Sequence, residues 1–179
     1  MSSRTTNLNI GYLEILAIYY PNVFAKRYGV DDTYEGLVHL GGEPIPPMET
    51  LDAKKIEYTK DQVWLKIKAL RDYKLNEGGY PTSVGWFHSD PEAQLNYEDL
   101  YKKKGLLQYM PVEQRMWKKM GGGFVPMTEA IVDEIFSVKT TQKMSIFAKA
   151  VEHDTAMRMS SDPLNYDFTV GWPLTFQEV

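Results

Sequence analysis

The feature that most constrains the fold is a long run of helical spacing near the end of the chain, at residues 128–159. Apolar side chains such as Ile135 and Ile146 recur there at steps of three and four residues, as on one face of an amphipathic helix. Thr128 is a good N-terminal cap for this helix. The stretch SVKTTQ, residues 137–142, is β-branched and polar, which favours a bend or a break. The sequence therefore predicts either one long helix or a helical hairpin.

A small lobe is predicted at the other end of the chain, at residues 1–48. Residues 10–20 have helical spacing, and Pro21 ends it. Two short strands are expected around Tyr28 and at residues 37–40, separated by turn residues and followed by a proline-rich stretch. A helix and a hairpin of this size bury too little surface to be stable alone, so the lobe needs a neighbour to cover it.

The middle of the chain alternates between helical and extended patterns. The sequence predicts a linking helix at 48–55 and a second helix at 59–76, capped by Thr59 or Asp61. One strand is expected at 80–87, followed by a helix that starts at Ser89. A hairpin is then expected, with arms at 117–120 and 123–125 around three glycines. The predicted fold class is α+β. The small lobe is followed by a mainly helical body at 49–160 with short antiparallel strands, and then by an extended aromatic tail at 161–179.

Composition excludes several classes of function. The chain has 179 residues, no cysteine and a net charge of −4, so disulfides, thiolate nucleophiles and cysteine-ligated metals are absent. The acidic balance argues against a general nucleic-acid-binding surface, which needs clustered Lys and Arg. No apolar stretch is long enough to span a membrane, and the N-terminus lacks the pattern of a signal peptide. We expect a soluble protein made in the cytoplasm.

Aromatic residues make up 13% of the chain, and they recur in the tail. Rigid aromatic side chains are common at protein interfaces, and a free polar tail would carry few of them. The tail is therefore expected to lie extended on this chain or on a partner. The residues predicted to bind partners are Tyr166, Phe168, Trp172 and Phe176 in the tail, with Tyr19 and Tyr20 in the small lobe.

The stretch WFHSD, residues 86–90, brings together residue types found in catalytic triads and metal sites. Triad members must converge through space, and consecutive side chains on a strand point to opposite faces. Ser89 followed by Glu92 fits a helix capping box better, with Asp90 adding negative charge at the helix start. A hydrolase or metal enzyme centred on His88 and Asp90 remains the alternative of another class.

The remaining candidates for chemistry have simpler structural interpretations. His39 and His153 show no metal-ligand spacing with each other or with His88. The three glycines lack the Lys-Ser/Thr that follows in a phosphate-binding loop, so they are interpreted as a tight turn. Trp64, Trp86 and Trp117 are expected in the core, although exposed rings lining a groove would indicate carbohydrate binding. No catalytic residue, cofactor or metal is predicted.

Several short motifs follow one another between residues 61 and 159. They are Trp64, Ile67, Lys68, Arg71 and Asp72; then Trp86 to Asp90; then Trp117 to Met120 and Gly123 to Val125; then Thr128, Ala130, Ile135, Phe136 and Ile146 to Ala148. This order resembles a phage domain family of unknown function, whose structural signature corresponds here to Trp64, Trp86, His88, Ser89, Asp90, Trp117 and Phe124. The small lobe, with Tyr20-Pro21 and the PIPP stretch at 44–47, is similar to the N-terminal lobes of phage tail-fibre assembly proteins.

The resemblance implies a non-enzymatic bacteriophage tail protein that binds tail-fibre or baseplate proteins, located in the virion tail. A fibre-assembly chaperone that is not retained in the virion is the second possibility. Self-association is also compatible with the pattern. The family has no established catalytic residue, so none is carried over. The three-glycine turn and the aromatic tail depart from the family pattern, and the tail is a candidate interaction element of this protein.

Overall fold

The computed structural model describes residues 10–29 and 31–179, which form two compact units. The first unit comprises the described residues up to Lys66 together with Thr155–Tyr166. The second unit comprises Ile67–Asp154 and Asp167–Val179. The division therefore falls inside two long helices, whereas the predicted divisions at residues 48 and 160 coincide with a helix start and a helix end. Each unit is described below by itself.

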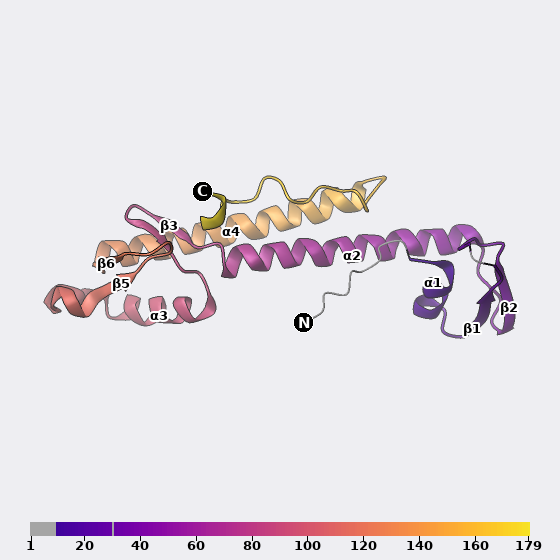
Figure 1. Ribbon diagram of the computed structural model, residues 1–179, viewed down its shortest axis with the longest axis horizontal. Helices are drawn as coiled ribbons and strands as arrows, with labels where there is room; N and C mark the ends of the chain where they lie inside the picture. Colours follow the sequence, from indigo (N-terminus) through magenta and orange to yellow (C-terminus); the bar gives the residue numbers. More distant parts are fainter. Residues whose placement is uncertain (1–9, 30) are drawn as a thin grey trace. The chain divides into compact units, whose positions relative to one another are not determined.

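The first unit contains the predicted helix and hairpin (Figure 1). Helix α1, Tyr12–Tyr19, ends just before Pro21, as expected. Strands β1, Val23–Arg27, and β2, Leu37–Gly42, pair antiparallel. The first strand thus begins soon after the proline and ends before Tyr28, so its predicted position was a few residues too late.

The core of the first unit joins α1 and the hairpin to the start of α2. Ile15 and Leu51 are fully buried, and Leu16 is nearly so. The Tyr12 hydroxyl donates a hydrogen bond to Asp52 Oδ1 at 2.6 Å. This hydrogen bond, with burial, raises the pKa of Tyr12 to about 12. The neighbour that the small lobe was predicted to need is therefore the first part of α2.

Helix α2, Met48–Asn76, is a single helix of 29 residues, so the prediction of two helices at 48–55 and 59–76 was wrong. Thr59 was expected to start the second helix as a cap. Instead its hydroxyl donates to the carbonyl of Lys55 at 2.9 Å, one turn earlier in the same helix. This bond satisfies the Thr59 side chain without ending the helix.

In the second unit, α2 is followed by a short hairpin where one strand was predicted. Strands β3, Tyr80–Thr82, and β4, Gly85–Phe87, pair antiparallel. Gly85 has a φ of +124°, a conformation that other residues rarely adopt, and the chain reverses just before it. Helix α3, Pro91–Lys102, follows.

Two 3-10 helices, η1 at Lys104–Tyr109 and η2 at Val112–Arg115, connect α3 to a second hairpin. Its strands are β5, Met116–Lys118, and β6, Phe124–Pro126, close to the predicted arms. All three glycines of the turn at 121–123 have positive φ values, between +74° and +99°. The glycine run is therefore the turn that the sequence predicted.

Helix α4, Glu129–Met159, runs unbroken for 31 residues. Of the two predicted alternatives, one long helix is therefore confirmed and the helical hairpin is wrong. The Thr128 hydroxyl accepts the N–H of Ile131 at 3.3 Å, confirming the predicted cap. The Thr140 hydroxyl donates to the Phe136 carbonyl, so the polar stretch at 137–142 stays helical. Burial of Ile135 and Ile146 also outweighs the small cost of β-branched residues.

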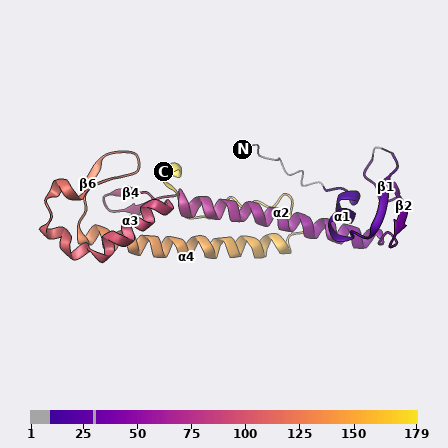
Figure 2. The ribbon, with the colours of Figure 1, turned by 90° about the horizontal axis from the view of Figure 1, so that it is seen from below.

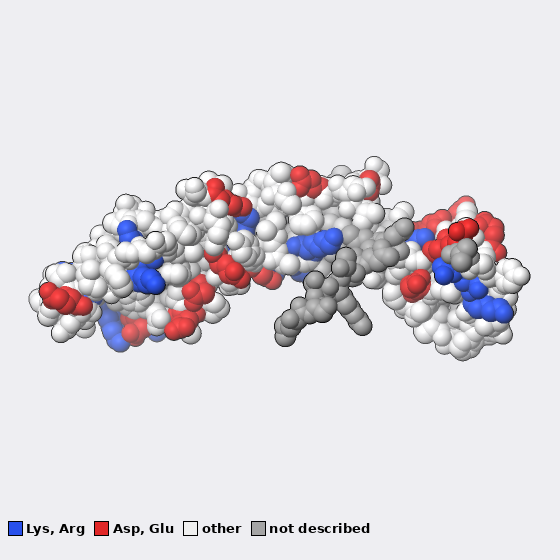
Figure 3. All heavy atoms as spheres, viewed as in Figure 1, with Lys and Arg blue, Asp and Glu red and all other residues white. Residues whose placement is uncertain are grey.

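The fold class is α+β: a helix-plus-hairpin lobe and a mainly helical body with short antiparallel strand pairs. In the second unit, the end of α2 runs beside α4 (Figures 1 and 2). The core there joins Phe87, Tyr97, Met127, Val132 and Ile135. Within the described residues, no helix is long and apolar enough to cross a membrane. Acidic and basic side chains are interspersed on the face shown in Figure 3.

Candidate functional site

The polar residues of the WFHSD stretch form a corner between β4 and α3. Ser89 is 2% exposed, and its Oγ accepts the backbone N–H of Gly79 at 2.9 Å. The Ser89 carbonyl accepts a hydrogen bond from Gln94 Nε2 at 2.7 Å. Ser89 therefore fastens the start of α3 to the segment that leads into β3. A nucleophilic serine would instead present its hydroxyl to a base in an open site.

The helix start predicted at this corner is present, but Asp90 is the cap. Asp90 Oδ1 accepts the N–H of Ala93 at 2.9 Å, and Pro91 occupies the first helical position. The predicted capping box of Ser89 and Glu92 is wrong, because the Ser89 hydroxyl is turned toward Gly79.

His88 is half-buried and borders a shallow pocket of about 220 Å³ together with Glu77 and Gln177. The structure brings His88, Ser89 and Asp90 to this pocket, with the hydroxyl and the carboxylate already bonded to backbone groups. Among the described residues, no group of three or more His, Asp or Glu side chains could hold a metal ion. The geometry therefore supports a structural corner better than a catalytic triad.

The C-terminal segment, Asp167–Val179, packs on the second unit through its aromatic rings. Trp172 is only 8% exposed and stacks on His153, with ring centroids 5.3 Å apart. Its indole N–H donates to the Phe168 carbonyl at 2.7 Å. His153 Nε2 lies 2.9 Å from the carbonyl oxygen of Val170. One sequence-predicted partner residue, Trp172, is thus used within the chain itself.

The end of the C-terminal segment is fixed at two further points. Phe176 is half-buried, its ring centroid lies 6.2 Å from that of Trp86, and its N–H donates to Gly78 at 2.8 Å. Lys74, of which 4% is exposed, contacts the Glu178 carboxylate at 2.9 Å. Gly121 has a φ of +74°, and a Cβ there would lie 2.8 Å from the Phe176 ring, so a larger residue would strain the backbone and displace the ring. The tail is therefore laid on this chain, one of the two predicted alternatives.

The other residues selected from the sequence are half-buried or exposed. Tyr166, Phe168, Tyr19 and Tyr20 are half-buried, and the Lys54 ammonium lies 4.9 Å from the Tyr19 ring centroid. The signature residues Trp64, Trp86 and Trp117 are half-buried, and Phe124 is 63% exposed. Trp117 packs against the core, with its ring centroid 5.5 Å from that of Tyr97 and the two ring planes tilted by 34°.

An open apolar groove lies between α3, η1, η2 and β5 in the second unit and has a volume of about 390 Å³. We call it the Met groove. Its apolar lining consists of Leu100, Leu106, Leu107, Met110, Met116, Trp117 and Met127. Three methionines give such a surface adaptable packing, because their side chains are unbranched and polarizable.

Part of the apolar surface at the Met groove faces solvent. Leu106 is 59% exposed, Met110 is 36% exposed, and Tyr109 beside them in sequence is 79% exposed. Exposed apolar side chains that gather around a groove, instead of scattering singly, mark interaction sites.

One cation of the Met groove has no carboxylate partner in the described part of the chain. Arg115 Nη1 donates to the Met127 carbonyl at 3.2 Å, but its buried Nε finds no acceptor there. The groove's other charges, Lys103 and Asp99, pair with each other at 2.8 Å. The groove therefore has an excess positive charge beside apolar surface, which suits an apolar segment that also carries a carboxylate.

A second exposed apolar surface lies on the hairpin of the first unit. Phe24, Val38 and Leu40 are 58%, 37% and 60% exposed. Phe24 lies on β1 and the other two on β2, and the register of the two strands shifts between Phe24 and Ala25.

Sequence reasoning missed the Met groove because η1 and η2 are too short to show periodicity. The available signal was local: Leu106, Leu107, Met110 and Val112 are apolar residues in a stretch interrupted by Pro111. Such a stretch predicts neither a regular helix nor a strand, and exposure could not be inferred from it.

The architecture and surface together define a two-unit α+β protein with an open apolar groove beside an arginine that has no carboxylate partner among the described residues. A family model matches residues 58–170, and the chain belongs to that family, described as a domain of unknown function, DUF4376. The match includes the WFHSD corner, the Met groove and all of α4. No curated protein matches the chain, and no solved structure matches it.

Proposed function

We propose that this protein is a non-enzymatic component of a bacteriophage tail that binds a tail-fibre or baseplate protein through the Met groove. The observation that carries the docking role is the groove itself, where solvent-facing Leu106 and Met110 adjoin Arg115. The occupant is a partner segment with apolar side chains for the methionines and a carboxylate for the guanidinium.

Two features support a docking role over a catalytic one. The serine and aspartate of the WFHSD corner are bonded to backbone groups that they hold in place. The Met groove, by contrast, has apolar surface that the described part of the chain leaves open to solvent. Burying that surface against a partner releases water and stabilises the complex.

The assignment to a phage tail is supported by the order of motifs between residues 61 and 159 and by the small lobe. Both resemble phage proteins, as described from the sequence. The family that the chain belongs to has no assigned function, so the tail role is tested on particles.

The test measures whether the chain is retained in purified phage particles, by quantitative mass spectrometry, for the unchanged protein and two variants. Met110→Asp places a charge in the Met groove, next to the position that an apolar partner side chain would occupy. We expect it to lower retention by about tenfold or more, equivalent to at least about 1.4 kcal/mol. Met144→Asp is the matched control, since Met144 is 69% exposed on α4 and lines no pocket described here.

Each outcome has a distinct meaning. Absence of the unchanged chain from particles would favour the assembly chaperone that acts and then leaves. Equal retention of both variants would contradict docking through the Met groove. Equal loss of both would indicate a general solubility defect, so the folded fraction of each is measured by circular dichroism beforehand.

A further inference from the structure

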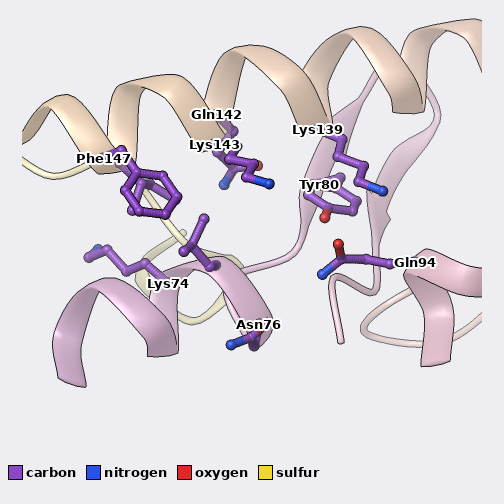
Figure 4. A pocket seen from close by; sticks show the side chains of 10 residues that line it. Lys74, Asn76, Tyr80, Gln94, Lys139, Gln142, Lys143 and Phe147 are labelled. Carbon is purple, nitrogen blue, oxygen red and sulfur yellow. The ribbon is translucent and has the colours of Figure 1, made fainter. Parts of the chain in front are cut away.

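A second pocket in the second unit has a different chemical character from the Met groove. It lies between the end of α2 and the middle of α4 and has a volume of about 180 Å³ (Figure 4). Lys74 and Asn76 of α2 lie on one side of it, and Lys139, Gln142 and Lys143 of α4 on the other. We call it the amine pocket.

The charges of the amine pocket do not balance. Lys74 is paired with Glu178 at 2.9 Å, and Lys139 with Glu98 at 3.1 Å. Lys143 has no acidic partner in the described part of the chain. No Asp or Glu is among the residues that line the pocket, so an anion entering it meets an uncompensated ammonium.

The pocket also contains an acceptor that lacks a donor. Gln142 Oε1 is buried and has no hydrogen-bond partner among the described residues. Figure 4 shows the Gln142 side chain projecting from α4 beside that of Lys143. Leaving such an oxygen unsatisfied costs about 1–3 kcal/mol, which a ligand hydroxyl group could recover.

The remaining wall provides further hydrogen-bonding groups and an apolar surface. The Tyr80 hydroxyl and the Gln94 amide lie next to each other at one end of the pocket in Figure 4. The Tyr80 phenol is protonated at neutral pH and can donate, and burial raises its pKa further, to about 12. Ile146 and Phe147 form the apolar part.

These groups and the volume define a ligand class. A pocket of about 180 Å³ holds roughly six waters at about 30 Å³ each, which is the scale of a small organic molecule. We propose that the amine pocket binds a small hydroxycarboxylate, of the size of a single sugar acid. The carboxylate pairs with Lys143, a hydroxyl donates to Gln142 Oε1, and the carbon skeleton packs on Phe147. This inference does not depend on the Met groove or on the tail role.

The test is isothermal titration of the full chain with glucuronate, glucose and acetate. Glucuronate has both the carboxylate and the hydroxyls, whereas glucose lacks the charge and acetate lacks the hydroxyls. We expect glucuronate to bind at least about threefold to tenfold more tightly than either, the gain of one charged contact near the surface. Equal affinity for all three, or no binding of glucuronate, would overturn the proposal.

Substitutions in the amine pocket test whether glucuronate binds there. Lys143→Gln and Gln142→Leu should each weaken glucuronate binding by about threefold to tenfold, without changing the thermal midpoint of the ligand-free protein by more than a few degrees. Lys102→Gln is the matched control, because Lys102 is also an exposed helical lysine but does not line the pocket. Binding that persists unchanged in both pocket variants would place the ligand elsewhere and refute the assignment.

A sugar acid can be free or part of a polymer, and a third arm distinguishes these sources. Polygalacturonate presents another sugar acid, galacturonate, in a chain, so free galacturonate is the monomer with which it is compared. Tighter binding of the polymer than of the monomer, per sugar unit, identifies a residue within a polysaccharide as the ligand, whereas preference for the monomer identifies a free acid. Sensitivity of both ligands to Lys143→Gln is required in either case.

Discussion

The C-terminal segment and the Met groove both contain large apolar side chains, but they use them in opposite ways. Trp172 of the C-terminal segment is 8% exposed and stacks on His153, whereas Tyr109, next in sequence to Met110 of the Met groove, is 79% exposed. The sequence favoured the segment as the docking element because its aromatics are dense. A high density of aromatic residues therefore does not distinguish a contact within the folded chain from a contact with a partner, because aromatic rings are buried in both.

The difference also changes how a truncation is interpreted. Removing the C-terminal segment would expose the surfaces under Trp172 and Phe176 and leave Lys74 without Glu178. A truncated chain that failed to bind a partner would therefore not locate the binding site. Point substitutions in the two regions separate folding from docking.

The largest expected effect is that of Trp172→Ala. Loss of the buried ring removes its stacking on His153 and the hydrogen bond to the Phe168 carbonyl. We expect the free energy of unfolding to fall by about 3–5 kcal/mol, as for other buried aromatic truncations. Urea denaturation followed by circular dichroism measures it. Leu174→Ala, at a residue that is 62% exposed in the same segment, is the control and should cost less than about 0.5 kcal/mol. A loss below about 1 kcal/mol for Trp172→Ala would mean that the segment is not fixed to the chain as described.

How far the sequence predicted these regions depended on whether the signals were local. Pro21 ends α1 and Thr128 begins α4 because a missing N–H and a side-chain oxygen act within one helical turn. The three glycines form a turn for the same local reason. In each case the residue itself carries the constraint.

Where the prediction failed, distant contacts decided. Thr59 and Ser89 were both plausible helix caps, yet Thr59 donates back into α2 and Ser89 accepts from Gly79. The polar stretch at 137–142 did not break α4 because burial of its neighbours outweighed local propensity. The Met groove and the amine pocket are assembled from several elements, and no local pattern contains their geometry.

An intermediate effect is expected for Glu178→Gln, at the end of the C-terminal segment. Lys74 is 4% exposed, and Glu178 provides its carboxylate at 2.9 Å. Removing one partner of a fully buried ion pair lowers the free energy of unfolding by about 3–5 kcal/mol. We expect Glu178→Gln to lower it by about 1–2 kcal/mol, because Glu178 is 45% exposed.

The same pair predicts a pH dependence. The hydrogen bond from Lys74 holds the pKa of Glu178 below its ordinary value of 4.5. A depressed pKa in the folded state stabilises the protein above the unfolded value, and this contribution is lost as the pH falls through the folded value. The difference in unfolding free energy between the unchanged protein and Glu178→Gln should have its largest value at pH 7 and should decrease as the pH falls below about 4.5. A difference that stayed constant with pH would show that the pair contributes little.

The smallest expected effect on stability is that of Tyr109→Ala beside the Met groove. The ring is 79% exposed, so its removal returns little buried area to water, and the free energy of unfolding should change by less than about 0.5 kcal/mol. Measured by the same urea denaturation, this value completes the contrast with Trp172, an aromatic residue of comparable size. A loss above about 1.5 kcal/mol would mean that Tyr109 is packed within the folded chain and is not available to a partner. A small loss, combined with weaker partner retention for the same variant, would assign the exposed ring to docking, because only a contact made outside the folded chain can lower binding without lowering stability.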